Sequence, residues 1–135
     1  MVHTDEFPTV VTEGPGFVRI TVSGPSTGAR LRRLLERVVA ESESTGMACV
    51  LVDGREVPPP IPTTDKYDIG VATARSLDAK TKLAVLGRPV NVDHFFETVA
   101  RNRGANVAVF TDERAALEWL VGSAAAASAS PHSTY

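Results

Sequence analysis

The stretch from Met47 to Gly70, MACVLVDGREVPPPIPTTDKYDIG, decides how the rest of the chain can fold. It opens with six uncharged residues, 47–52, which predict a strand buried on both faces of a parallel sheet. Asp53 follows at once, so we expect it at the carboxyl end of that strand. A loop with four prolines spans 58–62, and residues 63–65 then open a helical pattern. Open α/β sheets bind ligands and partners just beyond the carboxyl ends of their parallel strands.

Outward from this stretch, apolar periodicity and turn residues predict nine elements. The expected strands are 9–12, 17–23, 47–52, 82–86 and 106–110. The expected helices end near residues 44, 78, 103 and 121, and the residues expected to cap their starts are Ser26 or Thr27, Thr63 or Thr64, Asn91 and Thr111. The first two strands form a hairpin through the turn residues 13–16. The order, ββαβαβαβα, predicts an α/β fold with a mixed, mostly parallel five-stranded sheet and four helices.

The helical stripes suggest how these elements pack. In the second helix, the expected buried stripe is Tyr67, Val71, Ala74 and Leu77, with Gly70 allowing a close approach to the sheet. We expect the helices and the strands to share one hydrophobic core, and its predicted members are Leu34, Leu35, Val50, Val52, Val85, Phe96 and Val109.

Composition limits the class of protein. A chain of 135 residues, 43% of them hydrophobic, predicts one domain, 1–121, followed by a low-complexity tail, 122–135, expected to be disordered and dispensable for folding. A net charge of −2 argues against nucleic acid as a partner. The single cysteine, Cys49, cannot form an internal disulfide, which fits a cytoplasmic location. No apolar run reaches the roughly 18 residues of a membrane span.

Catalytic signatures are absent from the sequence. It contains no GxSxG, no P-loop and no GxGxxG. Its histidines, His3, His94 and His132, have no cysteine, histidine or acidic residue at metal-ligand spacing. We therefore expect no catalytic residues, no cofactor and no metal, and a protein that is not an enzyme.

Polar residues that should meet at the carboxyl ends of two strands form the best candidate site. We call this set the rim, and its members are Asp53, Arg55, Thr63, Thr64, Asp65 and Arg88. One interpretation is a docking or anion-binding surface at the positive end of a helix. The alternative is local structure only, with the threonines capping the helix and Asp53 pairing with an arginine.

Four segments, VLVDGREV, KLAVLGRP, FFETVARNRGANVAVFTD and AALEWL, together with the element order, resemble the STAS superfamily. The resemblance covers Phe7 to Val121 and is closest to the anti-sigma-factor-antagonist-like branch, often labelled STAS/SEC14 domain proteins. It implies a compact mixed sheet with a regulatory surface at the start of the second helix, where the antagonists carry a phosphorylatable serine in a pattern close to Asp-Ser-Ser-Gly. This chain has Thr63, Thr64, Asp65 and Lys66 there instead. The resemblance thus makes Thr63 and Thr64 the candidate phosphoacceptors.

Three functions follow from these observations. The first is a noncatalytic regulatory or protein-interaction module, with a protein partner or a second copy of the chain bound at the rim. The second is a carrier of a small apolar ligand or lipid, which the label of the branch suggests and which requires a pocket. The third, with the least support, is an enzyme that uses the rim around Asp53.

Overall fold

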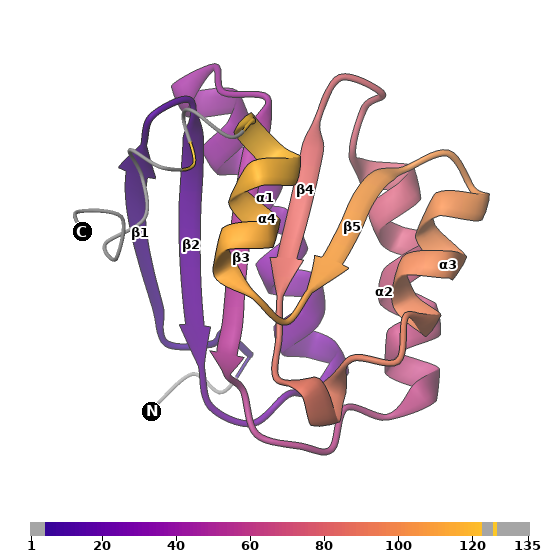
Figure 1. Ribbon diagram of the computed structural model, residues 1–135. Coiled ribbons are helices and arrows are strands. Elements are labelled where there is room, and N and C mark those ends of the chain that lie inside the picture. The colour runs from indigo at the N-terminus through magenta and orange to yellow at the C-terminus, as the bar shows by residue number, and fades with distance from the viewer. Residues whose placement is uncertain (1–4, 123–125, 127–135) are drawn as a thin grey trace.

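The computed structural model describes residues 5–122 and residue 126, and Figure 1 shows how its elements are arranged. The strands are β1 (Thr9–Gly14), β2 (Phe17–Ser23), β3 (Cys49–Glu56), β4 (Lys82–Leu86) and β5 (Asn106–Phe110). The helices are α1 (Gly28–Thr45), α2 (Thr63–Ser76), α3 (Phe95–Asn102) and α4 (Glu113–Val121), with a short 3₁₀ helix, η1 (Pro89–Asn91), before α3. The predicted α/β class and the predicted order of elements are confirmed.

The sheet has the order β1-β2-β3-β4-β5, with β1 antiparallel to β2 and the other pairs parallel. α1, α2 and α3 form a layer on one face, while α4 covers the other face. Because the three crossover helices run back against the parallel strands, α1, α2 and α3 all begin at the edge where those strands end (Figure 1). The starts of these helices and the carboxyl ends of the strands therefore share one edge of the molecule.

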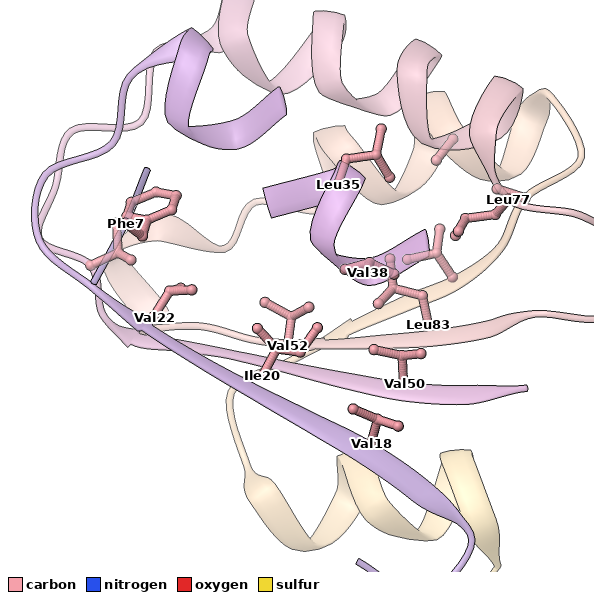
Figure 2. Close-up of a cluster of buried hydrophobic side chains, with 14 residues drawn as sticks. Phe7, Val18, Ile20, Val22, Leu35, Val38, Val50, Val52, Leu77 and Leu83 are labelled. Atoms are coloured by element: carbon pink, nitrogen blue, oxygen red, sulfur yellow. The ribbon is translucent and has the colours of Figure 1, made fainter. Parts of the chain in front are cut away.

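Alternation along the strands supplies two cores, one for each face. Ile20, Val50 and Val52 point towards Leu35 and Val38 of α1, as Figure 2 shows. The intervening strand residues pack against α4, and this second core contains Phe17, Leu51, Ala84, Leu86, Ala116, Leu117 and Leu120. Of the seven predicted core residues, three are buried in the first core and three are half-buried against it, whereas Val109 is half-buried in β5 and is not part of that core.

Of the four predicted helix caps, one is confirmed and three are wrong. Thr27 caps α1 as expected, since its hydroxyl accepts a hydrogen bond from Arg30 N at 3.0 Å. The capping prediction for Thr63 and Thr64 is wrong, because Pro62 occupies the N-cap of α2 and has no side-chain acceptor. α4 is capped by Asp112, one residue later than predicted, through its carboxylate and Ala115 N.

The third helix starts later than predicted. Residues 89–91 form the 3₁₀ turn η1, and α3 begins only at Phe95, so the prediction of a cap at Asn91 is wrong. The Asn91 side chain is engaged elsewhere, where its Nδ2 donates to the Val57 carbonyl at 3.0 Å. Asp93 takes over near the helix start by accepting from Phe95 N at 3.0 Å.

The buried face of α2 also differs from the predicted stripe. Leu77 of that stripe is buried and Ala74 packs against the first core, but Tyr67 is 43% exposed, and the buried residues within the helix are Lys66, Gly70 and Thr73. Gly70 faces α3 rather than the sheet, and a Cβ there would lie 2.8 Å from Val99 Cγ1. The helix is therefore rotated so that its small residues meet α3, a contact between helices that apolar periodicity alone does not reveal.

The predicted tail, 122–135, lies outside the described residues except for Gly122 and Ala126. Ala126 is fully buried in the core under α4. None of the helices within residues 5–122 is long and apolar enough to cross a membrane.

Replacing Leu35 by Ala is expected to lower the free energy of unfolding by about 2–5 kcal/mol, because the buried side chain leaves a cavity. Leu35 is 7% exposed and packs between α1 and the sheet. Urea denaturation measures the change. Val10→Ala, at a site 62% exposed, serves as the control and should leave the midpoint nearly unchanged.

Replacing Gly70 by Ala is expected to destabilise the protein by about 1–3 kcal/mol through overpacking against Val99, although alanine favours a helix. The double variant Gly70→Ala, Val99→Ala removes the methyl groups that clash and should recover part of the loss. Thermal denaturation of the two single variants and the double variant gives the coupling free energy between residues 70 and 99. Strictly additive effects would show that the close approach of α2 to α3 does not set this cost.

Candidate functional site

Asp53 lies within β3 and not after it, on the face that α4 covers, and is only 5% exposed. Arg19, from β2, binds it through Nη2 and Oδ2 at 2.7 Å. Arg55 binds both carboxylate oxygens, with Nε to Oδ1 at 3.0 Å and Nη2 to Oδ2 at 2.8 Å. The backbone N–H of Arg55 adds a third bond, at 3.1 Å to Oδ1. A buried carboxylate is stable here because two guanidinium groups and a backbone N–H satisfy it.

Glu113, in the first turn of α4, completes the arrangement. Its Oε1 lies 2.9 Å from Arg55 Nη2, and its Oε2 lies 3.3 Å from Arg19 Nη1. We call Arg19, Asp53, Arg55 and Glu113 the charge cluster. It has two positive and two negative charges, and it joins β2, β3 and the start of α4.

The electrostatics of the cluster keep Asp53 ionised. Burial alone would raise the pKa of Asp53, but the hydrogen bonds and charge of Arg55, with a hydrogen bond from Arg19, outweigh it and hold the pKa below its ordinary value of 3.8. The hydrogen bond to Asp53 raises the pKa of Arg55 in turn. A carboxylate held ionised in this way is a weak base, so its chemistry suits a structural pair better than general-base catalysis.

A chain of hydrogen bonds leads from the cluster along the edge of the sheet. Arg88, after β4, donates from Nε to the Arg55 carbonyl at 2.6 Å. Asn91 bonds the Val57 carbonyl, and the Asn91 carbonyl accepts from Lys66 Nζ at 3.0 Å. The two loops that follow β3 and β4 are thereby held together with the first turn of α2.

The structure divides the rim into two parts. Asp53, Arg55 and Arg88 are in direct contact through the bonds above. Thr63 and Thr64 begin α2, which packs in the layer on the opposite face of the sheet from the charge cluster. Asp65 lies near the start of α1, where its Oδ1 would be 3.5 Å from a Cβ at Gly28.

Thr63 and Thr64 are exposed, and their hydroxyl groups have no hydrogen-bond partner within the described residues. The hydroxyls are therefore not used for capping, the role that sequence reasoning gave them. Both groups face solvent at the edge where the strands of the sheet end.

Sequence reasoning missed Arg19 as a partner of Asp53 and Glu113 as a partner of Arg19 and Arg55. Arg19 alternates with the apolar residues of β2, which placed it on the opposite face from Val18 and Ile20. Glu113 was recognisable only as an acidic residue in the first turn of a helix. The two are 94 positions apart, and only the packing of α4 across the sheet brings them together.

A cavity of about 160 Å³ lies between the layer of α1, α2 and α3 and the sheet. Its walls are almost wholly apolar and include Leu34, Val52, Ile69 and Val85. Lys66, Asn91 and Asp93 are among the few polar residues that line it. The pocket that an apolar-ligand carrier requires is thus present, although it is small.

The described residues, 5–122 and 126, contain no candidate metal site. Within that part of the chain, no three His, Cys, Asp or Glu side chains gather closely enough to hold a metal ion. His94 contacts Glu97, with 2.7 Å between Nδ1 and Oε1.

Comparison with known proteins gives a match in structure but not in sequence. No family model matches the chain, and no curated protein matches it. Among solved structures, the crystal structure of an anti-sigma factor antagonist from Mycobacterium paratuberculosis matches with a TM-score of 0.61 and 17% sequence identity. The match covers 89% of this chain and 98% of the other. The two proteins therefore share their fold, which confirms the fold expected from the resemblance to the STAS superfamily.

Replacing Asp53 by Asn is expected to lower the free energy of unfolding near neutral pH by about 1–3 kcal/mol, because two arginines lose an ionised partner. The pKa of Asp53 is depressed in the folded state, so its contribution is present above the ordinary value of 3.8 and is lost as the pH falls through the folded value. The difference between variant and parent should therefore shrink as pH falls from about 5 towards 2.

Urea denaturation across this pH range measures the effect. Asp68→Asn, at an exposed position of α2, removes the same charge and is the control. An Asp53→Asn variant as stable as the parent at pH 7 would show that the charge cluster contributes nothing net to folding.

Proposed function

We propose that the protein is a noncatalytic regulatory module that binds another protein at the edge where β3 and β4 end and α2 begins. The docking surface comprises the exposed residues Thr63 and Thr64 and the half-buried residues Arg55 and Arg88, and Arg55 is held in place by the other members of the charge cluster. A shared fold with an anti-sigma factor antagonist supports this class of function. The weak basicity of Asp53 supports a noncatalytic role.

The observation that carries the proposal is that Thr63 and Thr64 are exposed and that their hydroxyl groups do not cap α2. Both hydroxyls lie exposed at the first turn of α2, and Pro62 leaves them without a capping role. Threonine at a helix start is ordinarily explained by capping. Here that explanation fails, and recognition by a partner or a modifying enzyme accounts for two hydroxyls presented to solvent at a strand-end edge.

The surroundings of the threonines suit a docking surface. The hydrogen bonds of Arg88, Asn91 and Lys66 fix the loops before binding, which reduces the entropy lost when a partner is bound. Val90, in the middle of this loop system, is 69% exposed, and Tyr67 on α2 is 43% exposed. Exposed apolar side chains within a polar border are typical of the centre of an interface.

Thr63 and Thr64 are also the proposed phosphoacceptors. A phosphate on either residue would add negative charge at the positive end of α2, where it is favourable for the helix. The same charge would alter the surface presented to a partner. Such a modification would thus change binding while leaving the fold intact.

Replacing Thr64 by Ala or by Asp tests the proposal, because neither change removes a hydrogen bond within the described fold. Both variants should unfold within about 0.5–1 kcal/mol of the parent. A pull-down from the native cytoplasm identifies the partner, and calorimetry then measures its affinity. We expect the Thr64→Asp variant to change that affinity at least tenfold.

Ser76→Ala, at the exposed far end of α2, is the matched control and should bind as the parent does. Arg88→Gln tests the other part of the docking surface. Light scattering of the purified protein measures its molar mass in solution, and thereby shows whether the partner is a second copy of the chain or a different protein. Unchanged binding by both Thr64 variants and by Arg88→Gln would exclude this edge as the docking surface.

A further inference from the structure

The cavity under α1, α2 and α3 is apolar along its length and polar at one end. The strands contribute Val52 and Val85 to its floor, and the helices contribute Leu34, Ile69 and Phe96 to its roof. Its volume of about 160 Å³ is close to the roughly 150 Å³ that holds a benzene molecule in an apolar protein interior. The space therefore accepts a single ring or a short chain, and it is too small for a drug-sized ligand or a lipid.

The polar end is formed by Lys66, which is only 9% exposed. Its ammonium group donates to the Asn91 carbonyl and to Asp93 Oδ2, both at 3.0 Å. An ammonium has three donors, and within the described residues the third finds no acceptor. A largely buried cation with one unused N–H beside an apolar, partly open pocket is a site for an anionic oxygen, because the pair would form with reduced contact to bulk water.

We propose that this cavity binds a small carboxylic acid, a single-ring or short-chain compound whose carboxylate pairs with Lys66 while its apolar part fills the space above the sheet. This inference goes beyond the docking surface, because it concerns the pocket under the helices and not the exposed hydroxyls, although Lys66 also helps to hold the loops of that surface. The apolar part of the ligand is removed from water when it packs against the valine and leucine side chains of the pocket. The carboxylate exchanges hydrogen bonds to water for a charged hydrogen bond from the Lys66 ammonium group.

The acidic groups near the polar end have defined partners. Glu97 is 15% exposed, and its two oxygens contact His94 Nδ1 at 2.7 Å and Val109 N at 2.9 Å. Asp93 is 57% exposed, and its Oδ1 accepts from Phe95 N. Asp93 is thus the charged group that competes with a bound carboxylate for Lys66, and its removal should favour the ligand.

Titration of the full chain with benzoate, followed in ¹H–¹⁵N spectra, tests the proposal. Benzyl alcohol, which matches the ring but lacks the charge, is the comparison ligand. We expect benzoate to shift the amide signals of cavity-lining residues and to bind at least tenfold more tightly than the alcohol. Lys66→Met, which keeps the length of the side chain, should remove that preference, and Asp93→Asn should strengthen benzoate binding.

Lys80→Met removes the same charge at an exposed position and should bind benzoate as the parent does. Val85→Phe and Ile69→Phe each fill the cavity from a different wall, and either variant with a folded spectrum should lose binding of both ligands. Three results would overturn the proposal. They are no shift of cavity signals at millimolar benzoate, equal affinity for acid and alcohol, and a preference that survives in Lys66→Met.

Discussion

Burial of the Asp53 carboxylate in the central strand is the constraint on which the organisation of the candidate site depends. A charge between the sheet and α4 is tolerable only with complete pairing, so Arg19 must come from β2, Arg55 from β3 and Glu113 from α4. The same requirement fixes the end of β3. Arg55, held by Asp53, presents its carbonyl to Arg88 and thereby sets the position of the next loop.

The two proposed sites meet at this edge because the fold brings the helix starts and the strand ends together. The exposed hydroxyls belong to the outer surface of the first turn of α2, and Lys66, on the inner side of that helix, reaches the cavity. Asn91 connects them to the strand ends, since its carbonyl accepts from Lys66 and its amide bonds the Val57 carbonyl. Any communication between the interior and the docking surface has this short path available.

Strands, order and the parallel sheet could be predicted from the sequence because period-two alternation and buried valine runs are local signals. Details that depend on distant partners could not. Asn91 looked like a cap and instead bonds a carbonyl 34 positions away, and Arg19 and Glu113 are 94 positions apart. Pro62 removed the cap expected from Thr63, because the helix begins one residue earlier than the hydroxyls require. Among the contacts of the rim residues, only the pairing of Asp53 with an arginine nearby in the sequence could be predicted from the sequence.

The bond from Glu97 to the Val109 backbone also bears on how copies of the protein meet in a crowded solution. β5 is the last strand of the sheet, and the N–H of Val109 points away from β4 towards the open side. Unpaired donors on such a strand are the template on which another chain can add and start a growing β-aggregate. The Glu97 carboxylate already occupies this donor and places a negative charge beside it. One side chain of α3 therefore blocks one of the donors through which another chain could add to β5.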